Sequence, residues 1–198
     1  MLQFFSEKYG NPASRQHHFG WVAEEAVESA RNTIARLLSI EPKEIIFTSG
    51  ATESNNLALI GVAETYSNRG KHIVTCVTEH KSVLDTFQYF EKRGYEVTYL
   101  PVDEYGLIDV NKLEDSLTDK TILVSIMIAN NEIGTIQDVK QIGELCRSKG
   151  VFFHTDATQA VGKISVEINK WNVDLLSFSS HKIYGPKGIG ALFIRSQN

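Results

Sequence analysis

The chain has 198 residues, of which 42% are hydrophobic and 22% charged, and its formal net charge is −4. This length suffices for one domain with a substantial core, and the composition is that of an ordinary globular protein. There is no long basic run typical of nucleic-acid binding, no apolar run of the ~18 residues that a membrane span needs, and no signal-peptide pattern. We therefore expect a cytoplasmic protein, with an organelle left open, that contacts neither nucleic acid nor membrane.

Apolar, β-branched runs alternate with helical stretches along the chain. Several of these runs are continuously apolar, which is typical of strands buried on both faces of a sheet. The expected strands are 44–49, 72–77, 96–100, 121–127, 151–155, 174–178 and 190–195. Such alternation predicts an α/β fold in three layers, with a mainly parallel seven-stranded sheet and helices on both faces.

Four helices are predicted between the strands. An apolar stripe from Phe19 to Leu38 predicts the first, and a second follows Thr52 and includes Leu57. The others cover 83–93 and 136–149, each followed by a glycine, Gly94 or Gly150, suited to a C-terminal cap. The connection between the last two strands is too short for a helix, so these strands are antiparallel or not neighbours. We expect an N-terminal arm over 1–16 and a single domain over 17–198.

Polar groups follow five of the expected strands, where the carboxyl ends of parallel strands form ligand sites. The small-residue turn 50–52 opens a helix and suits a phosphate, although alone it reads as a plain helix cap. Asp156 alone reads as a strand-end cap, His80 as an interior histidine, and Lys182 as a solvated lysine.

The combination of these residues favours a pyridoxal 5'-phosphate (PLP) site. PLP needs a lysine for its Schiff base, a carboxylate for its ring nitrogen and a cradle for its phosphate. Lys182 and Asp156 are one connection apart in the chain, at the same edge of the sheet. The turn 50–52 supplies the cradle, and the glycine-rich loop after Lys182 would hold the lysine near the sheet.

The ordered motifs resemble the cysteine desulfurases, in the class V aminotransferase group of fold-type I PLP enzymes. The resemblance covers nearly the whole chain and rests on these motifs: Gly10-Asn-Pro-Ala-Ser, Phe47-Thr-Ser-Gly-Ala-Thr-Glu-Ser-Asn-Asn, Thr78-Glu-His-Lys-Ser-Val-Leu, Asn130-Asn-Glu-Ile-Gly, His154-Thr-Asp-Ala-Thr-Gln, and the stretch from Ser177 to Leu192. It implies conversion of L-cysteine to L-alanine with persulfide transfer, for iron–sulfur assembly and thiolation. It also implies a homodimer that serves scaffold or sulfur-acceptor proteins.

The resemblance gives each site residue a role. Lys182 would hold PLP covalently and act as base and acid, Asp156 would bind the ring nitrogen, and His80 would stack on the ring. The ring hydroxyl would be reached by Asn131 and Gln159. The phosphate would be bound by Ala51, Thr52, Ser179 and His181. No metal site is expected.

The two cysteines do not match the family's sulfur acceptor. Cys76 falls in an expected strand and Cys146 in an expected helix, where free cysteines usually act as small hydrophobic residues. The family's acceptor cysteine lies in a C-terminal half that would follow Asn198, and so does its small domain. We therefore expect this chain to be the PLP-binding large domain, inactive by itself.

Three alternatives stay open at this point. The chain could be another class V enzyme, a selenocysteine lyase or a small-amino-acid aminotransferase. It could be a non-catalytic dimerisation module with a PLP-type fold. A dinucleotide-binding domain has little support, because no Gly-x-Gly-x-x-Gly follows the first expected strand.

Overall fold

The structure, a computed structural model, describes residues 1–196 and divides the chain into two compact units between Ile45 and Ile46. The first unit contains the helices α1 (Gln3–Ser6) and α2 (His18–Leu38) and a short 3₁₀ helix, η1 (Pro42–Glu44). The division into an arm over 1–16 and a domain over 17–198 stays a prediction.

Helix α2 begins one residue before the predicted stripe, because the His17 side chain accepts a hydrogen bond from the Gly20 N–H at 3.2 Å and caps the helix. The stripe itself is only partly right. Its large members Phe19 and Leu37 are exposed, and the buried positions are mostly small: Gly20, Ala23, Ala35 and Leu38. Position 20 has no room for a side chain, because a Cβ there would lie 1.8 Å from the Ser14 carbonyl oxygen.

Helix α2 has 21 residues, but glutamate and arginine side chains recur along it, so it is not a continuous apolar segment. Across residues 1–196, no helix combines the length and the apolar character that crossing a membrane requires.

A seven-stranded sheet organises the second unit, in the order β1-β7-β6-β5-β4-β2-β3. Its strands are β1 (Ile45–Thr48), β2 (His72–Cys76), β3 (Glu96–Leu100), β4 (Thr121–Ser125), β5 (Phe152–Asp156), β6 (Leu175–Ser179) and β7 (Gly190–Ile194). The pairs of β2 with β3 and β4, of β4 with β5 and of β5 with β6 are parallel, whereas β6 and β7 are antiparallel. The predicted mainly parallel sheet is confirmed, and of the two arrangements left open for the last two strands the antiparallel pair is the one present.

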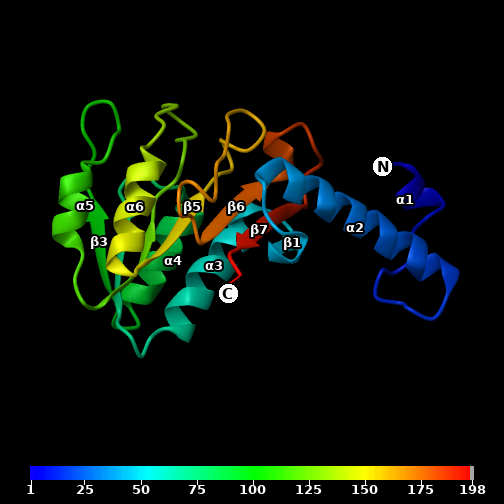
Figure 1. Ribbon diagram of the computed structural model, residues 1–198, viewed down its shortest axis with the longest axis horizontal. Helices are drawn as coiled ribbons and strands as arrows, with labels where there is room; N and C mark the ends of the chain where they lie inside the picture. The colour runs from blue at the N-terminus through cyan, green and yellow to red at the C-terminus, as the bar shows by residue number, and fades with distance from the viewer. Residues whose placement is uncertain (197–198) are drawn as a thin grey trace. The chain divides into compact units, whose positions relative to one another are not determined.

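Helices cover both faces of this sheet (Figure 1), as predicted. On one face lie α3 (Ala51–Thr65) and α4 (Lys81–Glu91), and on the other lie α5 (Val110–Ser116) and α6 (Val139–Lys149). This arrangement follows from right-handed crossovers, because the chain moves along the sheet one way from β1 to β3 and then returns through β4 to β6.

The helix boundaries differ from the predicted ones where polar side chains cap a helix. Helix α4 starts at Lys81 rather than 83 because His80 caps it, and α6 starts at Val139 rather than 136 because Asp138 caps it. Gly150 caps α6 as expected, with φ at 67°. Helix α4 ends at Glu91, so Gly94 lies in the turn beyond the cap rather than at it.

The main core lies between the sheet and the helices α3 and α4. It joins Leu59 of α3 and Phe87 and Phe90 of α4 to the strand residues Ile73 and Leu123, all 1% exposed or less. Burying side chains of this size provides most of the free energy that holds these layers together. Leu57, expected in this helix, is exposed on its outer face.

Candidate functional site

A pocket of about 480 Å³ lies at the carboxyl ends of the parallel strands, the volume range of small-molecule sites. All nine site residues predicted from the sequence line it: Ala51, Thr52, His80, Asn131, Asp156, Gln159, Ser179, His181 and Lys182. Four strands and one helix N-terminus bring them together, across 132 positions of sequence (51–182). Their individual roles stay predictions.

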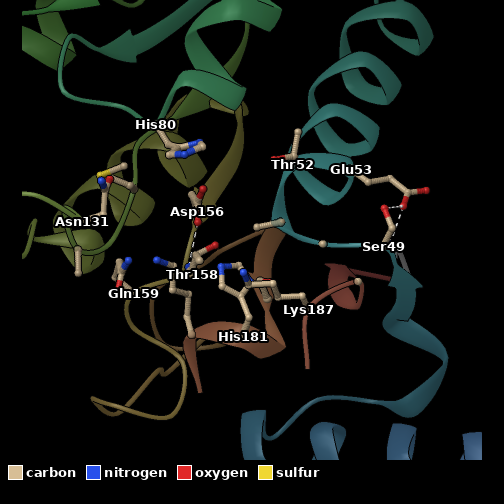
Figure 2. Close-up of a pocket in the computed structure, with 17 residues that line it drawn as sticks. Ser49, Thr52, Glu53, His80, Asn131, Asp156, Thr158, Gln159, His181 and Lys187 are labelled. Atoms are coloured by element: carbon tan, nitrogen blue, oxygen red, sulfur yellow. Dashed lines mark hydrogen bonds between the residues drawn. The ribbon is translucent and has the colours of Figure 1, made fainter. Parts of the chain in front are cut away.

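Asp156 ends β5 and lies at the floor of this pocket, 6% exposed. Its Oδ1 accepts a hydrogen bond from the Thr158 N–H at 2.9 Å, and its Oδ2 accepts one from the Asn55 Nδ2 at 2.8 Å. A carboxylate has about four lone-pair sites, so acceptor capacity is left for a ligand. The side chain is thus held in place without being saturated (Figure 2).

The N-terminus of α3 forms another wall of the pocket. Gly50 is the N-cap residue of the helix and has no side chain that could accept a hydrogen bond from the first N–H groups. The first N–H groups of a helix have no partner within the helix, and with the helix dipole they favour an anion such as phosphate. The neighbouring Glu53 does not compete for this position, because its carboxylate accepts hydrogen bonds from the Ser49 N–H and hydroxyl, both at 2.6 Å.

These two bonds lower the pKa of Glu53, the hydroxyl bond having the larger effect. Figure 2 shows Glu53 and Ser49 together on the far side of the first turn from His80 and Asp156. The negative charge of Glu53 is therefore fixed away from the pocket floor.

Lys182 ends the short 3₁₀ helix η2 (Ser180–Lys182), which directly follows β6. Two hydrogen bonds connect the loop after Lys182 back to Ser180. The Ser180 carbonyl oxygen accepts one from the Gly185 N–H at 2.9 Å, and the Ser180 hydroxyl donates one to the Pro186 carbonyl oxygen. Just before it, the Ser179 hydroxyl is bonded to the His181 Nδ1 at 2.7 Å. The predicted tight loop is present, and it holds Lys182 beside the strand that neighbours β5.

Three other predicted residues reach the pocket from separate elements. His80 caps α4, Asn131 follows β4, and Gln159 follows β5. Figure 2 shows Asn131 and Gln159 on one side of the space below His80, and Thr52 on the other. The Gln159 Oε1 accepts a hydrogen bond from the exposed Lys163 Nζ at 2.6 Å.

Thr158 and Lys187 also line the pocket, although the sequence analysis gave them no role. The Thr158 hydroxyl oxygen is buried and has no hydrogen-bond partner among the described residues. Such a group usually indicates a missing partner, which a ligand can supply. Thr158 lies in the motif His154-Thr-Asp-Ala-Thr-Gln and Lys187 in the stretch from Ser177 to Leu192, so these motifs could have indicated both residues.

Behind the pocket lies a buried carboxyl, Glu79, which is 5% exposed. Its Oε1 accepts the Met127 N–H at 2.6 Å, whereas its Oε2 has no partner within the described residues. Burial raises the pKa of Glu79 well above its usual range, and the charge of Asp156 raises it further.

The two cysteines are free and buried, as predicted. Burial raises the pKa of both thiols, that of Cys146 to about 12. Reactive cysteines need the opposite, a thiolate stabilised in an accessible position. Among residues 1–196 there is also no cluster of three side chains able to hold a metal ion.

Comparisons with known proteins place this chain among relatives of known fold. The model of the family "Aminotransferase class-V" matches residues 1–198. "Cysteine desulfurase IscS" of Rickettsia massiliae is 56% identical over 197 residues, and that of Colwellia psychrerythraea is 59% identical over 196 residues. These alignments cover 100% and 98% of this chain and 48% of each relative, so the chain spans about half the length of the curated relatives it matches.

Solved structures agree with this result. A "NifS-like protein" has a TM-score of 0.96 at 45% identity over 100% of this chain and 54% of its own. "SspA in complex with cysteine" has a TM-score of 0.95 at 41% identity, covering 98% of this chain and 56% of its own. The resemblance found in the sequence motifs is confirmed, and the chain belongs to the aminotransferase class-V family.

Proposed function

We propose that this chain is the PLP-binding large domain of a cysteine desulfurase. The observation that carries the proposal is the pocket in which Asp156, Lys182 and the N-terminus of α3 meet. These groups fit the three polar parts of PLP: a carboxylate for the ring nitrogen, an amine for the aldehyde carbon and free helix N–H groups for the phosphate. The unpartnered Thr158 hydroxyl adds a donor for the ligand.

Bound PLP supplies an electron sink for the substrate's Cα. The protein's part is to hold the ring and move protons. Asp156, held by its two hydrogen bonds, would bind the ring nitrogen. Lys182 would hold the cofactor through its amine and then carry a proton to and from the substrate, and His80 would cover one ring face.

Cysteine as substrate is supported by the relatives, cysteine desulfurases at 56–59% identity, and by a similar structure solved with cysteine. By the family's pattern we also propose a cytoplasmic homodimer that passes sulfur to iron–sulfur scaffold or acceptor proteins. Other class V activities, a selenocysteine lyase or a small-amino-acid aminotransferase, share the Asp156 and Lys182 pair. Analysis of the product separates an aminotransferase, which yields a keto acid, from a desulfurase, which yields alanine.

Cofactor binding is tested by adding PLP to the chain and recording its visible absorbance. We expect a yellow protein that borohydride bleaches, and a colourless Lys182→Ala variant. Lys140→Ala is the matched control, because Lys140 is exposed on α6 and does not line the pocket. A folded parent chain without the absorbance, or a Lys182→Ala variant that retains it, contradicts the proposed site.

Turnover is a separate question, because neither cysteine of the chain suits sulfur transfer. Both are buried with raised thiol pKa values. With L-cysteine and a reductant, we therefore expect this chain to bind PLP and to release no sulfide over multiple turnovers. Sustained sulfide release would contradict this expectation.

A further inference from the structure

Four side chains form one continuous hydrogen-bonded chain behind the pocket. The Asn55 Nδ2 lies 2.8 Å from the Asp156 Oδ2 and 2.9 Å from the Ser82 hydroxyl oxygen. That hydroxyl lies 2.8 Å from the His80 Nδ1. Asn55 belongs to α3, Ser82 to α4, His80 to the cap of α4, and Asp156 to the end of β5. The hydrogen bonds therefore connect three elements that meet at the pocket.

The orientation of the Asn55 amide follows from these contacts. Asn55 is fully buried, and the amide nitrogen carries two hydrogens, one for each of its two neighbours. In the reversed orientation its carbonyl oxygen would face the Asp156 carboxylate, which can only accept. The Asn55 oxygen has no partner among the described residues, so no other contact holds the amide. Asp156 and Ser82 therefore set its direction.

The direction of the next bond is set as well. Because the Ser82 oxygen accepts from Asn55, its own hydrogen is available for the His80 Nδ1. The Ser82 backbone N–H also points at Nδ1, at 3.1 Å, and a backbone N–H can only donate. With two donors directed at it, Nδ1 must present a lone pair, and the ring hydrogen must be on Nε2.

We propose that Asn55 and Ser82 are positioning residues that join Asp156 to His80 and hold His80 as its Nε2–H tautomer. Their effect on a cofactor rests on the proposed function, because Asp156 and His80 line the pocket proposed for PLP. Figure 2 shows both facing the same space, where a ring bound to Asp156 would lie under His80. One network of hydrogen bonds would thus hold both the Asp156 carboxylate, proposed for the nitrogen of the cofactor ring, and the His80 imidazole, proposed to cover the face of that ring.

The tautomer is tested first without any cofactor. The chain is labelled with ¹⁵N-histidine, and long-range ¹H–¹⁵N spectra at pH 8 identify which ring nitrogen of His80 carries hydrogen, with His80→Gln for the assignment. We expect the Nε2–H pattern. An Nδ1–H pattern for His80 in the parent chain overturns the proposal.

Two variants then test the hydrogen-bonded relay that runs from Asp156 through Asn55 and Ser82 to His80. Ser82→Ala removes the hydroxyl but keeps the backbone N–H, so the Nδ1 resonance should move toward that of a nitrogen with one hydrogen bond fewer, and Asn55→Ala should move it the same way. Ser54→Ala is the matched control, because it removes a buried hydroxyl of α3 that bonds Thr48 at 2.7 Å and not the relay. An unmoved Nδ1 resonance in Ser82→Ala, or an equal movement in Ser54→Ala, overturns the relay.

PLP titration tests the consequence. Each relay variant should bind PLP about threefold to tenfold more weakly, the range of one net hydrogen bond. The double variant should be no weaker than the weaker single variant, since either change breaks the same chain. Additive losses overturn the relay. If the parent shows the Nε2–H pattern but binds no PLP, the proposed function fails and the relay stands.

Discussion

Gly190 is the position at which a single added methyl group should disturb both the fold and the proposed phosphate cradle. It is buried at the start of β7, opposite Ser179 of β6. A Cβ at this position would lie 2.6 Å from the Gly50 carbonyl carbon, 2.7 Å from its Cα and 2.8 Å from the Phe178 carbonyl oxygen. All three atoms belong to the backbone, so no side chain can rotate away.

The expected cost follows from these distances. Carbon atoms in contact prefer a separation of about 3.5 Å, so the backbone would have to separate by roughly 0.9 Å on the Gly50 side. Overpacking of this kind costs about 1–3 kcal/mol of the free energy of unfolding. Because Gly50 precedes α3, the movement also displaces the first N–H groups of that helix. We expect PLP affinity to fall about tenfold, which corresponds to about 1.4 kcal/mol.

Urea denaturation and PLP titration measure these two effects in the Gly190→Ala variant. The matched control is Gly61→Ala, the same chemical change in the interior of α3, where a Cβ meets nothing within 4 Å. That variant should gain up to about 1 kcal/mol from helix propensity. The reasoning is refuted if Gly190→Ala is as stable as the parent chain and binds PLP equally well.

Two buried titratable groups give predictions of opposite sign. Burial raises the pKa of Glu79 in the folded protein. The contribution of Glu79 to the free energy of unfolding is therefore full below its unfolded pKa of about 4.3, and it declines as the pH rises toward the folded pKa. The free energy of unfolding of Glu79→Gln, minus that of the parent, should therefore grow with pH in urea titrations, whereas parallel curves would exclude the effect. His154 is bonded to the hydroxyls of Ser125 and Ser177, and burial lowers its pKa to about 4. Its contribution is full above pH 6.5 and declines as the pH falls toward 4, by about 3 kcal/mol, so His154→Gln should lose less stability over that interval than the parent. Equal losses in the two proteins would contradict this.

The sequence predicted the sheet well because buried strands have a simple signature. The strands β2 and β4 are largely apolar and buried along their full length, and the short connection between β6 and β7 left only an antiparallel pair or strands that are not neighbours. Helix α5 was missed for the opposite reason. It has seven residues and a single buried one, Leu113, which is too little for a helical period to be visible.

The site residues that follow strands were predictable, because the topology brings every such position to one edge of the sheet. Motifs that lie far apart in the chain, such as those of Thr52 and Lys182, could therefore be assigned to one pocket. The exact starts of α4 and α6 were not predictable from apolar periodicity, since the capping side chains His80 and Asp138 set them.

Asn55 shows where sequence reasoning about the site stops. It is buried on α3 beside Ser54 and with Ala58, Leu59 and Val62, so polar residues interrupt a mostly apolar buried face. A buried amide is costly unless it is hydrogen-bonded, so this interruption alone predicts a polar partner. The partner, however, is Asp156, 101 residues away, and only the parallel crossovers bring β5 under α3. The pattern along the helix therefore indicates that the site has a supporting residue, and the topology of the sheet is needed to identify what it supports.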